Sequence, residues 1–184
     1  MPESIPGSLT RAFIQKHGLE FVAINSCESA TQEVRKTLQD FYKTQPFSSD
    51  LDLVVFGSIF RNEFTKGSDV DWTLLIDGQA DARHLDEAKF IEKKIQEKKL
   101  GKPSPAGAFG ITTISHDLVH YIGGENDTNQ NITRRVLLLL ESGKIIFSPD
   151  QTDGTAYDRV VNAVLGQYVN HDSGLQRSSP IPGL

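Results

Sequence analysis

Two apolar runs lie close together in the first half of the chain, and they constrain its fold most strongly. Residues 51–56 read LDLVVF and residues 70–76 read VDWTLLI. Short runs rich in β-branched and aromatic residues, bounded by Gly and Asp, are typical of buried strands. We therefore predict strands at Leu53–Phe56 and Val70–Ile76, with Asp77-Gly78 as the turn that ends the second strand.

The second run opens with two aspartates, Asp69 and Asp71, separated by one residue. Alternate side chains of a strand share a face, so the two carboxylates are expected to project together. Carboxylate oxygens placed in this way can hold one or two divalent cations. We expect Val70, Thr73 and Leu75 on the opposite face.

A Gly-Ser pair, Gly57-Ser58, ends the first run. Glycine lets the backbone approach a phosphate closely because it has no side chain, and the serine adds a hydroxyl donor. Phosphate and metal sites would then lie side by side. This layout is typical of a metal-dependent phosphoryl-transfer site.

These residues resemble the signature G-S-x-x-R-x-E…S-D-x-D of the nucleotidyltransferase superfamily related to DNA polymerase β. The matching residues are Gly57, Ser58, Arg61, Glu63, Ser68, Asp69 and Asp71. The chain looks most like bacterial nucleotidyltransferases grouped with the regulatory-protein uridylyltransferases and glutamine-synthetase adenylyltransferases. The resemblance continues more loosely through SHDLVHYIGG and NITRRVLLLLES, over roughly residues 30–165.

The resemblance implies an α/β (α+β two-layer) fold of the polymerase β-like type, with a short mixed sheet flanked by helices. It also implies transfer of a nucleoside monophosphate from an NTP, such as ATP, to a hydroxyl of a protein or small molecule, with release of pyrophosphate. Mg²⁺ or Mn²⁺ would be the cofactor, held by Asp69 and Asp71 as catalytic metal ligands. Gly57 and Ser58 would hold the β- or γ-phosphate.

Three further residues are candidates for contacts with the nucleotide phosphates. Arg61 could bind a phosphate oxygen bidentately, or it could form an ion pair with Glu63 or another nearby carboxylate. Lys66 is a second basic candidate. Ser68 belongs to the resembling motif, although it could simply cap a turn before the strand.

The superfamily usually adds a third carboxylate from a neighbouring strand, and we expect Asp117 to fill this metal-binding, catalytic role. Asp117 follows the predicted strand Phe109–Ser115, and a position just past that strand's end could face the Asp69/Asp71 pair. Glu125 and Asp127 are alternatives. If none of the three reaches the metals, the protein would bind nucleotide without turning it over.

Two other polar groups allow competing interpretations. His116 and His120, spaced i, i+4, could bind zinc, but the Glu of a metalloprotease motif and an evident third ligand are missing. Hydrogen bonding near the end of the third strand is the simpler expectation for them. Arg134 and Arg135 could contact a triphosphate or be surface charges, and the Asn and Thr residues of the preceding loop could cap a helix.

The rest of the chain is expected to be mainly helical, in one domain over residues 1–169 with a flexible tail over 170–184. Helices are predicted at Leu9–His17, from a Ser29–Gln32 capping box through Phe41, and at His84–Lys99, Ile132–Ser142 and Ala156–Val169. A further short strand is predicted at Lys144–Phe147. The resemblance implies a further helical region in related proteins, and the sequence leaves open whether this chain is a truncated version of a longer protein.

Composition narrows the functional classes. The formal charge of −5 makes nucleic acid a less favoured partner than a protein or small-molecule acceptor. The single Cys27, the lack of an apolar run near 20 residues and the N-terminus MPESIPGSLT predict a reduced, cytoplasmic protein without membrane attachment. Alternatives to the transferase are a nucleotide-binding regulatory module without turnover and a nucleotide second-messenger synthase.

Overall fold

A four-stranded sheet in the order β3-β2-β1-β4 forms the centre of the molecule. The computed structural model describes residues 8–44, 46–101, 112–145 and 154–178. The strands are β1 Leu51–Phe56, β2 Trp72–Ile76, β3 Thr112–Ile114 and β4 Ser142–Lys144. β1 pairs antiparallel with β2 and β4, whereas β2 and β3 are parallel. The sheet is therefore mixed, as predicted.

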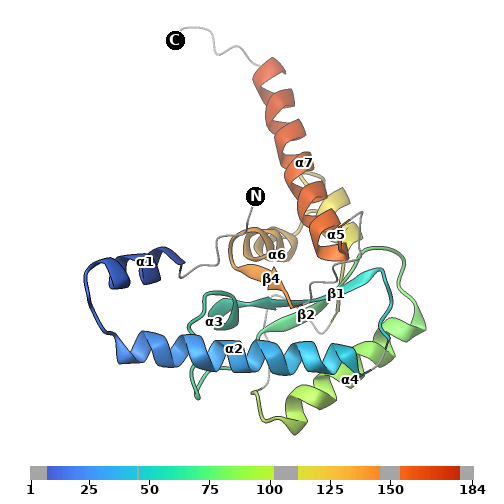
Figure 1. The fold of residues 1–184 in the computed structure, drawn as a ribbon. Helices are drawn as coiled ribbons and strands as arrows, with labels where there is room; N and C mark the ends of the chain where they lie inside the picture. Colours follow the sequence, from blue (N-terminus) through green and yellow to red (C-terminus); the bar gives the residue numbers. More distant parts are fainter. Residues whose placement is uncertain (1–7, 45, 102–111, 146–153, 179–184) are drawn as a thin grey trace, which may run out of the picture.

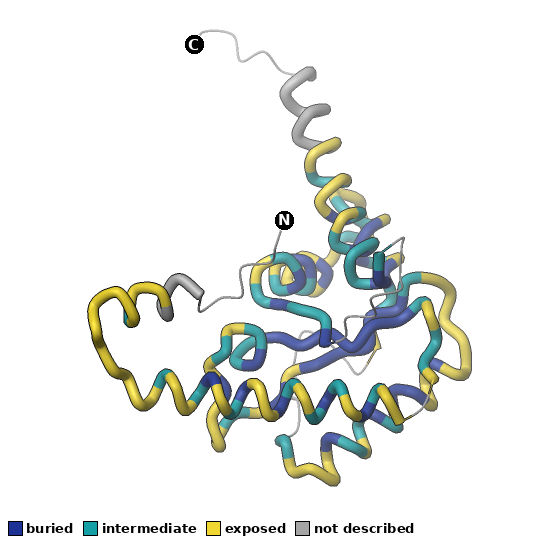
Figure 2. The backbone as a smooth tube through the Cα atoms, in the orientation of Figure 1, coloured by how far each residue is buried: buried dark blue, intermediate teal, exposed yellow. Residues whose placement is uncertain are grey.

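Helices cover both faces of this sheet (Figure 1). They are α1 Ser8–Lys16, α2 Val22–Lys43, α3 Gly57–Phe60, α4 Ala82–Glu97, α5 Ser115–His120, α6 Asn129–Leu140 and α7 Ala156–Ser178. The long α2 and α4 lie on one face, and α5, α6 and α7 lie on the other. Because both faces are covered, all described strand residues of β1 and β2 are buried (Figure 2).

The alternation of side chains in the two central strands divides the core into two clusters. Leu53 and Leu74 pack in the cluster under α2 and α4, and Val54 and Leu75 pack in the cluster under α5, α6 and α7. Val70 belongs to the first cluster. The expectation that Leu75 shares the face of Val70 is therefore wrong, because positions separated by an odd number of residues face opposite sides of a strand.

Several predicted boundaries differ from the observed ones. The predicted helix start at Ser29 is wrong, since α2 begins at Val22 and the Ser29 hydroxyl donates to the carbonyl of Asn25 within the helix. A Ser inside a helix can satisfy its hydroxyl in this way, so a Ser with the spacing of a capping box need not mark the start of a helix. β3 begins at Thr112; residues 109–111, and the predicted strand residues 146 and 147, lie outside the described part.

Two helices in the C-terminal half differ from what their hydrophobic periodicity predicts. α7 continues past the predicted end at Val169 to Ser178. In α6, Leu138 is 1% exposed but Leu140 is 70% exposed, so the apolar run there is only partly core. No helix among the described residues is long and apolar enough to cross a membrane.

Candidate functional site

The Gly-Ser turn and Asp71 are in direct contact. β1 ends at Phe56, and Gly57, the first residue of the short helix α3, adopts φ +60°, a conformation that side-chain-bearing residues rarely take. A Cβ at Gly57 would lie 3.2 Å from Oδ2 of Asp71. The amide of Phe56 also donates to the carbonyl of Asp71 at 3.0 Å. The end of β1 therefore places the turn and this carboxylate together, as the sequence predicted.

Asp69 lies against a second glycine, Gly101, in the segment that follows α4. Gly101 has φ +85°, and a Cβ there would clash with Oδ1 of Asp69 and lie 2.9 Å from its Cα. Beside it, the amide of Val70 donates to the carbonyl of Leu100 at 3.1 Å. The segment that follows α4 thus fixes the backbone of Asp69, a contact that no local sequence pattern predicted.

The two carboxylates repel each other and lack hydrogen-bonding partners. Both side chains are exposed, and neither accepts a hydrogen bond within the described ranges. Partial burial and the negative charge of Asp69 raise the pKa of Asp71, while the charge of Arg61 opposes this. Unpaired hard oxygen ligands fit a divalent cation such as Mg²⁺ or Mn²⁺. The donor set is therefore suited to the metal that the resemblance implies.

Arg61 follows α3 and bridges two glutamates. Its Nε donates to Oε2 of Glu63 at 2.8 Å, and its Nη1 donates to Oε2 of Glu141 at 2.7 Å. The hydrogen bond that Arg61 donates to Glu63 is the main reason that the pKa of Arg61 is raised. The ion-pair alternative is thus observed, and Arg61 at the same time lies close enough to influence Asp71.

The other phosphate-binding candidates occupy different settings. The Ser58 hydroxyl has no hydrogen-bond partner within the part of the chain that the structure describes. Ser68 caps a turn, because its hydroxyl accepts from the amide of Thr65 at 3.0 Å. Lys66 is exposed in the same loop. Ser58 is therefore the hydroxyl left free to donate to a ligand.

Asp117 lies at the opposite end of the sheet from the Asp69/Asp71 pair. β3 runs parallel to β2, and the last residues of the two strands, Ile114 and Ile76, are partners. Asp117 follows Ile114, whereas Asp71 precedes β2, so the length of β2, about 3.3 Å per residue, separates them. The expectation that a position past the third strand faces the pair required an antiparallel β3. The structure does not bring Asp117 to the pair.

The alternative carboxylates are also placed elsewhere. Asp127 accepts two hydrogen bonds from Nη2 of Arg135, at 2.8 and 2.6 Å, and Arg135 is only 1% exposed. Arg135 is thus neither a triphosphate ligand nor a surface charge, which corrects both readings of it. Glu125 is exposed in the loop before α6. Thr128 caps α6, as expected, through the amide of Asn131.

The two histidines are adjacent on α5. The rings of His116 and His120 lie with centroids 4.8 Å apart, and both side chains are exposed. His116 also contacts the ring of Tyr121. Within the described ranges, no three His, Cys, Asp or Glu side chains are grouped so that they could hold a metal ion. Among the described residues, these histidines make ring contacts and not the predicted hydrogen bonds.

Glu141 is a member of the site that the sequence did not indicate. It ends α6 and directly precedes β4, where Ser142 is the partner of Phe56. Glu141 therefore lies beside the start of the Gly57 turn, on the side of β1 away from Asp71. It is 80 positions from Arg61 in sequence, and no local motif marks it.

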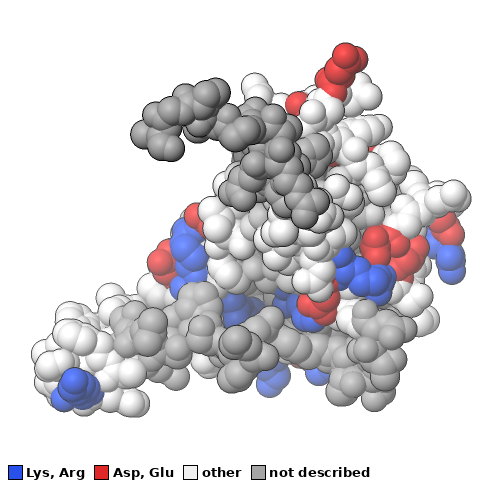
Figure 3. Space-filling model, turned by 90° about the horizontal axis from the view of Figure 1, so that it is seen from above, with Lys and Arg blue, Asp and Glu red and all other residues white. Residues whose placement is uncertain are grey.

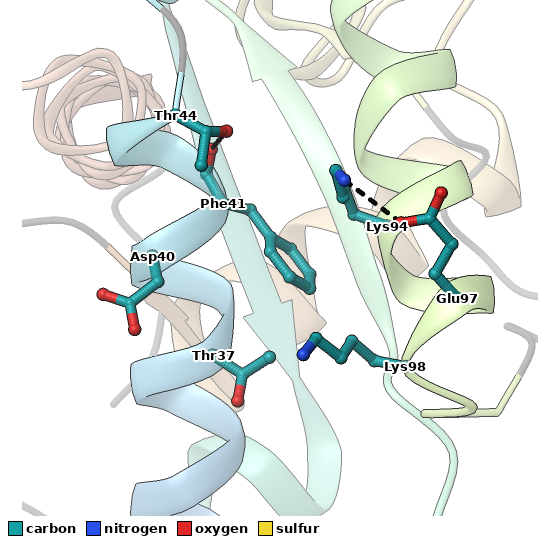
Figure 4. A pocket seen from close by; sticks show the side chains of 7 residues that line it. All are labelled: Thr37, Asp40, Phe41, Thr44, Lys94, Glu97 and Lys98. Carbon is teal, nitrogen blue, oxygen red and sulfur yellow. Dashed lines mark hydrogen bonds and ion pairs between the residues drawn. The ribbon is translucent and has the colours of Figure 1, made fainter.

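Two surfaces lie outside this site. An open hollow of about 380 Å³ between α2 and α4 is lined by Thr37, Asp40, Phe41, Thr44, Lys94, Glu97 and Lys98 (Figure 4). None of the candidate site residues lines this hollow. Figure 3 shows Lys and Arg side chains beside Asp and Glu over the body of the molecule, and one basic side chain apart from any acidic one at the lower left. The described residues form no broad basic patch on this face.

Comparison with known proteins supports the class that this geometry suggests. Residues 32–103 match the family model of the nucleotidyltransferase domain, a stretch that includes Gly57, Ser58, Asp69 and Asp71. No curated protein and no solved structure matches the chain. The match is consistent with a member of the nucleotidyltransferase superfamily. The chain's mixed four-stranded sheet flanked by helices is consistent with the polymerase β-like fold of that superfamily.

Proposed function

We propose that this protein is a metal-dependent nucleotidyltransferase that moves a nucleoside monophosphate from an NTP to a hydroxyl of a protein or small molecule. One observation carries the proposal: the Asp71 carboxylate packs against the Gly57 turn, with the unpaired Asp69 beside it. The turn that would bind phosphate and the two carboxylates that would bind metal thus share one end of the sheet.

Each residue has a distinct task in this proposal. Asp69 and Asp71 would hold Mg²⁺ or Mn²⁺, which would polarise phosphate oxygens and offset the charge on the leaving pyrophosphate. Ser58 would donate its free hydroxyl to the β- or γ-phosphate, and Gly57 would let the backbone approach it. Arg61 would donate from its guanidinium to the same phosphates.

The proposed reaction makes one bond and breaks one bond. The acceptor oxygen would form a bond to the α-phosphorus while the bond from that phosphorus to the bridging oxygen of pyrophosphate breaks in line. The side chains of this chain would orient the triphosphate and stabilise the charge that moves to pyrophosphate. The proton of the acceptor hydroxyl would leave to solvent.

Labelling tests this function directly. The protein would be incubated with each α-³²P-labelled NTP, ATP first, with Mg²⁺ or Mn²⁺ and cell extract. The products would be separated on gels and by thin-layer chromatography. Label on a protein or small molecule that disappears with the Asp69→Asn/Asp71→Asn double variant supports the proposal. If every labelled NTP is recovered unchanged and no product carries label, the proposal is contradicted.

A nucleotide-binding regulatory module is the second candidate. It is favoured by one observation: within the described ranges, no third acidic side chain joins Asp69 and Asp71 in a metal-binding group. With an incomplete metal site, nucleotide would bind without transfer. Metal-dependent NTP binding in calorimetry together with no transfer of label would favour this candidate over the enzyme.

A further inference from the structure

We propose that Glu141 is a positioning residue that holds Arg61 in place for contact with the nucleotide phosphates. This inference rests on the proposed function, since it assigns a role within the same site. Its basis is that one guanidinium donates to two carboxylates: Arg61 Nε donates to Glu63 at 2.8 Å, and Nη1 donates to Glu141 at 2.7 Å.

The hydrogen bonds to Glu63 and Glu141 leave part of the Arg61 guanidinium available. Arg carries five N–H donors in a fixed, planar arrangement. One on Nε and one on Nη1 are used, and the two on Nη2 have no partner among the described residues. A planar guanidinium held at two corners presents its third corner in a defined direction, which suits bidentate binding of phosphate oxygens.

Glu141 is itself firmly placed. The register of β4 sets it next to the Gly57 turn, since Phe56 is the partner of Ser142. The buried Ser142 hydroxyl donates to the carbonyl of Leu138 at 2.6 Å and ties the end of α6 to the start of β4. Glu63 is held locally, because its amide donates to the carbonyl of Ser58 at 2.8 Å. Glu63 is therefore tied to the Gly57-Ser58 turn, and Glu141 to the strand that pairs with the end of β1.

Stability alone does not account for this arrangement. The side chains of Arg61, Glu63 and Glu141 are 40%, 60% and 42% exposed. Ion pairs as exposed as these contribute little to folding, because water screens them and ordering long side chains costs entropy. Restricting the rotamers of Arg61 before the ligand arrives would instead reduce the entropy that binding must overcome. The expected effect of Glu141 is thus on ligand affinity.

Nucleotide binding by matched variants tests this inference. Calorimetry would measure the affinity of Mn²⁺ with inorganic tripolyphosphate, and of each Mn²⁺–NTP, for the wild type, Glu141→Gln, Arg61→Gln and the double variant. Glu33→Gln, at an exposed Glu on α2, is the matched control. We expect Glu141→Gln to weaken binding several-fold and Arg61→Gln about 10-fold or more, the loss typical of a hydrogen bond to a charged group.

The double variant separates positioning from general damage. If Glu141 acts through Arg61, Glu141→Gln should cost nothing further once Arg61 is Gln, whereas additive losses would contradict the inference. Unchanged or tighter binding by Glu141→Gln would also overturn it, the latter by showing that Glu141 competes with phosphate. If the wild type binds no Mn²⁺–NTP, or binds it no better than the Asp69→Asn/Asp71→Asn variant, the proposed function fails and this inference with it.

Discussion

The carboxylate of Asp71 lies 3.2 Å from the point where a side chain at Gly57 would begin. Gly57 directly follows β1, and Asp71 directly precedes β2. The hydrogen bond from the amide of Phe56 to the carbonyl of Asp71 joins these two segments. The close contact explains why a residue without a side chain is needed here. Any added atom would meet the carboxylate in a backbone conformation that already disfavours it.

Gly57→Ala should therefore lower both stability and nucleotide affinity. Alanine at φ +60° costs about 1–2 kcal/mol, and the contact with Asp71 adds to this. Chemical denaturation measures the stability. Gly67→Ala is the control, since its Cβ would meet nothing within 4 Å and its φ is not positive. Equal stability of the two variants would contradict the contact.

Gly101→Ala tests the support behind Asp69. Its Cβ would clash with the Asp69 side chain and lie 2.9 Å from its Cα, so Asp69 must move. We expect weaker Mn²⁺ binding, measured by electron paramagnetic resonance of free Mn²⁺. Gly18→Ala carries a similar positive φ with open space around it and isolates the backbone cost. Metal affinity that is the same in both variants would argue against the role of this contact.

The Asp69→Asn/Asp71→Asn variant should fold as well as the wild type or slightly better. Neither carboxylate has a hydrogen-bond partner in the described part of the chain, and the variant removes their mutual repulsion, worth at most about 1 kcal/mol at exposed sites. Added Mn²⁺ should raise the melting temperature of the wild type only, because a cation bound to the folded state stabilises it. Unfolding of the variant would indicate a structural role instead.

The Asp127–Arg135 pair predicts how stability responds to acid. Burial alone would raise the pKa of Asp127, but the hydrogen bonds and charge of Arg135, with the Gly123 amide, outweigh it and lower the pKa. A lowered folded-state pKa means that this contribution is present above the unfolded value of about 3.9 and is lost as pH falls through the folded value. Acid should therefore weaken the contribution of this pair.

Asp127→Asn isolates that contribution. At pH 7 the variant should lose about 3 kcal/mol, because it leaves the buried Arg135 without its counter-charge. The difference from wild type should shrink as pH falls below the unfolded pKa of about 3.9 and through the lowered pKa of Asp127 in the folded state. Asp40→Asn, at an exposed ion pair with Lys43, is the control and should show little difference at any pH. A gap that is constant with pH would contradict the assignment.

The half of the site that is local in sequence was predictable. Gly57, Ser58, Asp69 and Asp71 flank two strands whose composition is distinctive, and alternation along a strand is a short-range property. The expected face is nevertheless wrong for Thr73 and Leu75, which lie three and five positions from Val70 and so face the other side of the strand. Local patterns also misplaced the start of α2, because the Ser29 hydroxyl can bond inside a helix as well as cap one.

The other half depends on how distant segments pair. Asp117 was expected at the metals, but the parallel pairing of β3 with β2 puts it at the opposite end of the sheet. Glu141 reaches Arg61 only because β4 pairs with β1 in one particular register. Neither strand direction nor register over such separations is encoded in local periodicity, so chemistry that depends on them could not be derived from motifs.

A comparison of NTP labelled at the α-phosphate with the same NTP labelled at the γ-phosphate tests the central claim most directly. The wild type would be incubated with Mg²⁺, cell extract and NTP carrying ³²P at the α- or at the γ-phosphate, beside the Asp69→Asn/Asp71→Asn variant. The account predicts that α-label passes to an acceptor, that γ-label appears in pyrophosphate, and that the variant does neither. Transfer of γ-label to the acceptor, or equal α-transfer by the variant, would contradict nucleotidyl transfer at this site.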